Sequence, residues 1–139
     1  MAFLGSLDIV GSALSAERFR MDISLQNLAN AHTTRTANGE PYRRQQVVFE
    51  ERELTFDQAL ENVSGGVQVA EVVKSDRDFK PVYDPTHPDA DENGYVLYPN
   101  VDTTEERLDL MTASTAYEAN LTALSVMKAM VNRTLEMNK

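Results

Sequence analysis

Apolar residues recur at helical spacing in the first and last parts of the chain. The N-terminal segment places them at intervals of seven, with two more alongside: Leu7, Leu14, Met21 and Leu28, with Val10 and Leu25. The C-terminal segment repeats this arrangement: Leu110, Tyr117, Leu124 and Val131, with Ala113, Leu121, Met127 and Leu135. Because polar residues mostly lie off these rows, each segment predicts a long amphipathic helix with a narrow apolar seam.

Residues that break helices are confined to the middle of the chain. All five prolines lie between Pro41 and Pro99, and residues 12–38 and 100–139 contain neither proline nor glycine. Four runs in the middle are typical of strands: 42–50, 67–73, 79–83 and 95–98. The sequence therefore predicts an α+β fold, with long N- and C-terminal α-helices forming an antiparallel coiled-coil-like pair around a small irregular β-rich middle domain.

The predicted organisation has three parts. Residues 1–34 form an N-terminal assembly helix, 35–102 a β-rich middle domain with an acidic, proline-rich loop, and 103–139 a C-terminal assembly helix. Residues 103–106 (TTEE) fit a capping box, in which Thr103 and Glu106 exchange hydrogen bonds at the start of the last helix. Residues 55–60 are compatible with a short helix or a loop.

Neither seam can be buried by its own helix. A helix of about 30 residues extends about 45 Å, which is longer than the middle domain can cover. One interpretation is an intramolecular antiparallel coiled coil. The other is that the helix pair also packs against neighbouring subunits, because the apolar residues that flank the seams stay exposed after pairing, such as Ile9, Val10, Met130 and Met137.

Charge and composition restrict the function. The chain of 139 residues carries 13 Lys and Arg against 22 Asp and Glu, a net charge of -9, which argues against nucleic acid as a partner. It has no cysteine, which excludes disulfides, thiolate metal sites and a cysteine nucleophile. The apolar start of the chain lacks a preceding Lys or Arg and is interrupted by Asp8, so we expect no cleavable signal peptide and no membrane insertion.

One acidic segment resembles part of a calcium-binding loop. Residues 89–94 (DADENG) match the first six positions of an EF-hand, but Asn100 stands where a bidentate glutamate is required, and the flanking prolines prevent the helices. Asn93-Gly94 favours a tight turn instead. Weak cation binding, or docking of the acidic stretch 84–106 onto a basic neighbour, stays an alternative.

No other group of residues predicts catalysis or a cofactor. Arg43-Arg44 is expected on a solvated or salt-bridged strand face rather than on nucleic acid. His32 and His87 lack partners at a metal-ligand spacing, and no phosphate-binding loop or serine elbow is present. A hydrolase built on residues 84–91 would lack rigid supports. We therefore predict no enzyme, no metal, no cofactor and no small-molecule substrate.

Several segments carry a family resemblance: residues 25–34 (LQNLANAHTT), 41–45 (PYRRQ), 82–96 (VYDPTHPDADENGYV), 99–101 (PNV) and 113–120 (ASTAYEAN). Together they resemble the axial proteins of the bacterial flagellum, and within that family the proximal rod subunits of the basal body. The likeness covers nearly the whole chain. It departs from the family at His32, where Asn is usual, and at Thr115, where Arg is usual.

The resemblance implies a non-enzymatic subunit that polymerises through its terminal helices into a tubular drive shaft with a central export channel. It implies export through the flagellar type III apparatus without a cleaved signal, and a place in the rod that spans the periplasm. The implied partners are copies of itself, other rod subunits, the rod-base adaptor and the export apparatus. The amides of Asn27 and Asn30 would satisfy carbonyls in the last turn of the first helix, unless they are only an ordinary polar helix end.

The candidate subunit interface combines both seams with three asparagines: Leu7, Val10, Leu14, Met21, Leu25, Asn27, Leu28, Asn30, Leu110, Ala113, Tyr117, Asn120, Leu121, Leu124, Met127, Val131 and Leu135. The alternative function is a soluble, non-enzymatic binding module. In that case the helix pair closes on itself, and the acidic loop recruits a basic partner or a cation.

Overall fold

The computed structural model describes residues 2–54 and 65–137 and has an α+β fold, which confirms the predicted class. Along the described chain, four short strands follow the first long helix and precede the second. Their bounds are α1 Ala2–Ala29, β1 Gln45–Glu51, β2 Val67–Lys74, β3 Lys80–Tyr83, β4 Tyr95–Tyr98 and α3 Thr103–Met137. The short helix considered for residues 55–60 lies outside the described residues.

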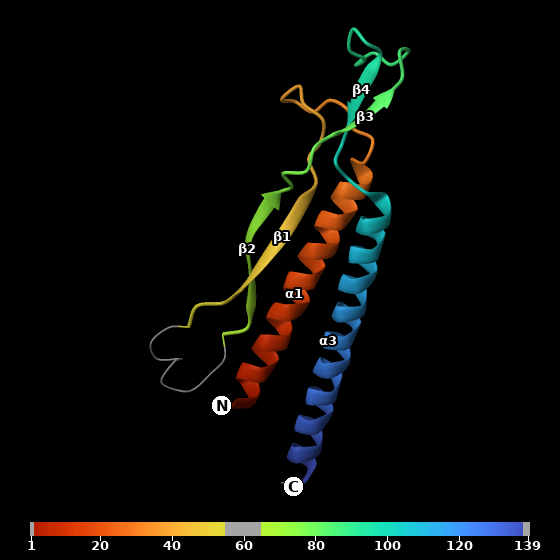
Figure 1. Cartoon of the computed structure of the whole chain (residues 1–139). Helices are drawn as coiled ribbons and strands as arrows, with labels where there is room; N and C mark the ends of the chain where they lie inside the picture. The colour runs from red at the N-terminus through yellow and green to blue at the C-terminus, as the bar shows by residue number, and fades with distance from the viewer. Residues whose placement is uncertain (1, 55–64, 138–139) are drawn as a thin grey trace.

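The two helices run antiparallel, side by side, as the seams predict (Figure 1). At 1.5 Å per residue they are about 42 Å and about 52 Å long. Both chain ends lie at the same end of the molecule, and α3 reaches beyond α1 there. Along α3 one row of buried and half-buried positions alternates steps of four and three: 106, 110, 113, 117, 120, 124, 127 and 131. This spacing is the pattern of a coiled-coil-like pair.

Asp102 caps the start of α3. Its Oδ1 accepts hydrogen bonds from the backbone N–H groups of Thr104 at 2.8 Å and Glu105 at 3.4 Å. The predicted capping box is therefore wrong. Thr103 is already the first helical residue, and the Glu106 carboxylate is occupied by Asn27 and Arg44. An aspartate carboxylate satisfies the free N–H groups and also suits the positive end of the helix dipole.

These backbone hydrogen bonds hold the pKa of Asp102 below its ordinary value of 3.8. A lowered pKa in the folded state gives stability that is present above pH 3.8 and is lost as the pH falls through the folded pKa. Asp102→Asn keeps the cap oxygen but removes the titration. We expect its melting temperature to fall less between about pH 5 and about pH 2.5 than that of the wild type. Thermal melts followed by circular dichroism would measure both proteins. If the melting temperatures of the variant and the wild type fell equally, the role of the Asp102 carboxylate as a titrating cap would be contradicted.

The middle of the chain forms two separate antiparallel sheets of two strands each. In the first, β1 and β2 pair from Gln45 opposite Lys74 to Glu51 opposite Val67, with an irregularity between Val48 and Phe49. This sheet packs against α1, on the side away from α3 (Figure 1). The second sheet, β3 with β4, projects beyond the end of the helix pair that lies opposite the chain termini.

The strand predictions are confirmed with small shifts at their ends. The first strand begins at Gln45 rather than residue 42, because the Tyr42 N–H is already donated to the carbonyl of Thr33. The predicted turn at Asn93-Gly94 is also confirmed. Gly94 has a φ of +79°, and its N–H is donated to the carbonyl of Asp91 at 3.0 Å. Only glycine adopts this left-handed conformation without steric cost.

The apolar core of the described residues is small. Its buried members are mainly alanine and valine: Val10, Ala16, Ile23, Ala31, Val96, Val101 and Ala113. Val10 is thus buried, and the expectation that it stays exposed after helix pairing is wrong. It lies on the same row of α1 as Leu14 and Met21, which the helix pair covers. Met130 and Met137 are exposed as expected.

Candidate assembly interface

A cluster of buried and half-buried polar side chains joins the ends of both helices to the start of β1. We call it the polar junction: Asn27, Tyr42, Arg44, Asn100, Glu106 and Asp109. Arg44 donates from Nε to Glu106 Oε1 and from Nη2 to Asp109 Oδ2, the latter at 2.9 Å. Glu106 is 1% exposed, so its charge depends on these partners.

Asn27 uses its whole amide within the polar junction. Its Nδ2 donates to the carbonyl of Gln45 at 2.8 Å and to Glu106 Oε2 at 2.9 Å. Its Oδ1 accepts from the Tyr42 hydroxyl and from the Gln45 N–H, both at 2.9 Å. The expectation that Asn27 satisfies carbonyls of the last helical turn is therefore wrong. Asn30 does so, because its Nδ2 donates to the carbonyl of Gln26 at 2.9 Å.

The polar junction also changes the acidity of its members. Burial raises the pKa of Tyr42, and the nearby Glu106 carboxylate raises it further, so the phenol stays neutral. Burial lowers the pKa of Arg44, but the hydrogen bond that Arg44 donates to Glu106 and the charges of Glu106, Asp109 and Glu105 outweigh this effect and raise the pKa. A neutral donor and a permanent cation are what these acceptors require.

The prediction that Arg43-Arg44 is salt-bridged is confirmed for Arg44. Its partners come from α3, more than 60 positions along the chain, and not from the acidic residues near it in sequence. Arg43 lies over the ring of Phe79, with its guanidinium carbon 4.3 Å from the ring centre. Arg44 thus connects the start of β1 to α3, whereas Arg43 packs within the middle domain.

The structure places most of the candidate interface residues between the two helices of one subunit. Ala113 and Val10 are buried, and the half-buried members are Leu7, Leu14, Met21, Leu28, Leu110, Tyr117, Asn120, Leu124, Met127 and Val131. Leu25, Leu121 and Leu135 are exposed. The seam residues therefore hold α1 and α3 together, and their contact with other subunits stays a prediction.

A second apolar row follows α3 on the face opposite the seam. Its large members are all exposed: Leu108, Met111, Val126, Met130 and Met137. We call these five residues the outer row. Together with Thr115, Ala119, Thr122 and Arg133 they follow steps of three, four and four, which repeat every 11 residues. Because 11 residues complete three helical turns, the row stays on one face. The seven-residue pattern hid this signal.

The acidic loop is held by its own side chains and neighbours. Asp84 Oδ1 accepts from the backbone and hydroxyl of Thr86, Asp91 accepts from the N–H groups of the turn, and Asp89 accepts from the Thr34 hydroxyl at 2.9 Å. Arg35 lies 3.4 Å from Asp89. Among residues 2–54 and 65–137 no three His, Asp or Glu side chains are placed to hold a metal ion.

The histidines pack on one aromatic ring. His32 and His87 lie with their ring centres 6.2 Å and 6.3 Å from that of Tyr98. Tyr98 belongs to β4, so this cluster holds the second sheet to the loops around it. Neither of the described helices combines the length and the apolar character that a membrane span requires.

Comparisons with known proteins agree with these features. The model of the family described as "Flagellar basal body rod FlgEFG protein C-terminal" matches residues 92–137. The chain is 43% identical to the flagellar basal-body rod proteins FlgC of Bacillus subtilis and Salmonella typhimurium, over 100% of both chains in each case. It is 37% identical to FlgC of Borreliella burgdorferi, over 97% of both chains.

Proposed function

The chain belongs to the FlgC family of flagellar basal-body rod proteins, and from this premise we propose that it polymerises through its terminal helices into the wall of a tubular rod. It is a structural subunit of the flagellar basal-body rod and not an enzyme. The outer row of α3 carries the proposal, because it is a long apolar surface that no other part of the described chain covers.

The size of the exposed surface supports assembly. The protein has an accessible surface of 9788 Å². A compact monomer of 15.5 kDa is expected to expose about 7,200 Å². Large apolar side chains on the helices are part of this exposed surface, since Met111 and Met130 are more than 60% exposed. Burial of such side chains between subunits would stabilise a polymer.

The two faces of α3 have different roles in this proposal. The seam is used within the subunit, where α1 covers it. The outer row, with the exposed residues Leu25, Leu121 and Leu135, is left for neighbouring subunits. The other predicted interface residues contribute by keeping the helix pair straight and closed.

We place the helix pair at the inner wall, around the export channel, and the two small sheets outside it. The arrangement of Figure 1 supports this, because the first sheet covers only one side of the pair and leaves α3 uncovered. The partners we propose are copies of the chain, other rod subunits, the rod-base adaptor and the type III export apparatus. The rod would cross the periplasm, and export would occur without cleavage of a signal.

Hydrogen exchange tests the proposal. In dilute solution we expect fast amide exchange in the outer halves of α1 and α3, near the chain termini, because Val10 is the single buried position among the described residues there and the others are half-buried or exposed. Polymerised protein should protect these amides. Amides near Glu106, which the polar junction holds, should be protected in both samples and serve as the internal control. Full protection of both helices in the dilute monomer, unchanged on concentration, would contradict the proposal.

A further inference from the structure

Apolar side chains are exposed on the second sheet, most of them on one face, while Val82 on the other face is 43% exposed. Val82 pairs with Val96 and Tyr83 with Tyr95, so Pro81, Tyr83, Tyr95 and Leu97 share one face of the hairpin. We call these four residues the hairpin face. Tyr83 is 65%, Tyr95 47% and Leu97 50% exposed, whereas Val96 on the other face is 1% exposed. Such a surface at the tip of a soluble subunit is typical of a contact site.

A groove with acidic side chains adjoins the hairpin face. It has a volume of about 270 Å³, and Tyr95 and Leu97 contribute one side of its lining. Asp89 and Asp91 lie in the same lining, with Arg35 already paired to Asp89. No Lys or Arg occurs between residues 84 and 106. The surface therefore fits a partner that carries apolar side chains together with Lys or Arg.

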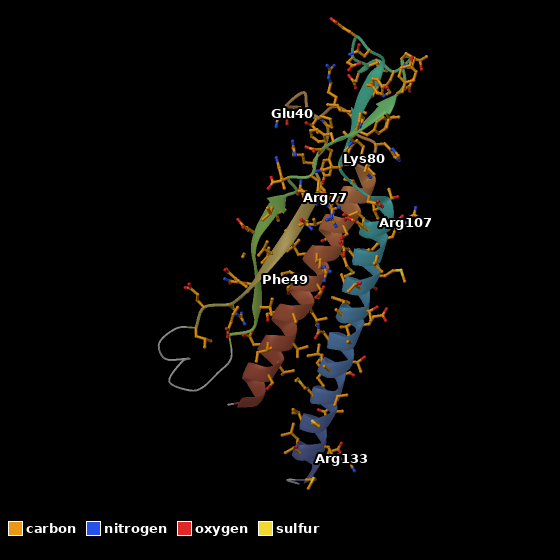
Figure 2. All side chains as sticks on the ribbon, viewed as in Figure 1. Glu40, Phe49, Arg77, Lys80, Arg107 and Arg133 are labelled. Atoms are coloured by element: carbon orange, nitrogen blue, oxygen red, sulfur yellow. The ribbon has the colours of Figure 1, made fainter. Side chains whose placement is uncertain are left out.

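The opposite end of the same molecule has this composition. Met130, Leu135 and Met137 are 63%, 60% and 82% exposed in the last turns of α3, where α1 no longer accompanies it. Lys128 and Arg133 lie in the same turns together with one acidic residue, Glu136, and neither basic side chain forms an ion pair within the described part of the chain. We call residues 128–137 the α3 end. Figure 2 shows Arg133 near this free end, far from the second sheet.

We propose that the hairpin face and groove of one subunit bind the α3 end of a second copy, head to tail. The two surfaces lie at opposite ends of an elongated molecule, so they cannot meet within one subunit. A contact between two different patches repeats from copy to copy and gives an open polymer rather than a closed dimer. This inference rests on the proposed function, because it specifies one of the contacts that would build the rod.

Cysteine crosslinking tests the contact directly, since the chain has no cysteine of its own. Leu97→Cys and Met137→Cys place one thiol in each surface at exposed positions. Mixing the two single variants should give a crosslinked dimer, whereas neither variant alone should. The double variant should give a ladder of trimers and longer chains. Val48→Cys with Met137→Cys is the matched control, because Val48 is exposed in the first sheet and should not crosslink.

Charge reversal tests the chemistry of the contact. Glu92→Lys at the hairpin tip and Arg133→Glu in the α3 end should each lower the yield of the crosslink between residues 97 and 137 by about two- to fivefold, the effect of an exposed ion pair. Glu92 is exposed and lies in the turn before β4. Combining both reversals should restore the yield. Equal yields in all four proteins would overturn the assignment of the acidic hairpin tip to the basic helix end.

The outcomes separate this inference from the proposed function. Crosslinks of the double variant that stop at two chains would indicate a closed dimer and overturn the head-to-tail contact. Crosslinks between two copies of Leu97→Cys would do the same. If the wild type forms polymers by sedimentation but residues 97 and 137 do not crosslink, the inference fails and the proposed function stands. If the wild type forms no polymer at any concentration and the helices are fully protected when dilute, the proposed function itself fails.

Discussion

Glu106→Ala should remove a large part of the stability of the folded subunit. The substitution leaves the Arg44 guanidinium, which is 6% exposed, without its closest carboxylate, and it removes the acceptor of the Asn27 amide. Loss of one partner of a buried ion pair costs about 3–5 kcal/mol. A domain of this size has about 5–15 kcal/mol in total. Urea unfolding followed by circular dichroism should show the loss in the midpoint.

Glu105→Ala is the matched control for this prediction. Glu105 is the preceding residue on α3, is exposed, and pairs with Arg77 at 2.8 Å. An exposed pair contributes about 0.2–1 kcal/mol, so this variant should stay close to the wild type. Replacing both members of the buried pair, by Arg44→Met and Glu106→Leu, should recover part of the lost stability. The importance of the polar junction would be refuted by similar midpoints for Glu105→Ala and Glu106→Ala.

Leu124→Asp and Val126→Asp should both abolish polymerisation, but for different reasons. Leu124 is half-buried in the seam, so a carboxylate there lowers the stability of the helix pair itself by about 2–4 kcal/mol. Val126 is 49% exposed in the outer row, so the monomer should lose less than about 1 kcal/mol. In the polymer the same carboxylate would be buried without a partner.

Urea unfolding and sedimentation of the two variants separate these effects. The two substitutions introduce the same side chain two positions apart on one helix, so their effects on helix propensity nearly cancel. If Val126→Asp formed polymers of wild-type length, the outer row would not be part of the subunit interface. An unchanged unfolding midpoint for Leu124→Asp would show that the seam does not hold the helices together.

The helices and their pairing could be predicted from the sequence because the information is local. A repeat of seven residues is visible in either segment alone and specifies both the helix and the face that pairs. The strands and turns could be predicted for the same reason, as at Asn93-Gly94, where two adjacent residues determine the backbone conformation.

The polar junction could not be predicted, because its bonds join positions far apart in the chain. Asn27 and Glu106 are 79 positions apart, and nothing in the neighbourhood of either indicates the other. The same contact explains the wrong capping box, since a local pattern assigned Glu106 to Thr103. The outer row was missed for another reason. Its period of 11 residues is as regular as the seam, but it includes threonines and an arginine between the apolar residues.

The position of the polar junction has a mechanical consequence. Charge-assisted hydrogen bonds are directional, so those at Asn27, Arg44 and Glu106 resist sliding and rolling of one helix over the other at that end. Toward the chain termini the half-buried seam positions of both helices are mainly apolar, and apolar contacts have no preferred direction. Each subunit is thus clamped at one end and compliant at the other. In the rod that we propose, identical chains would then adapt to different neighbours mainly at the end that carries the chain termini.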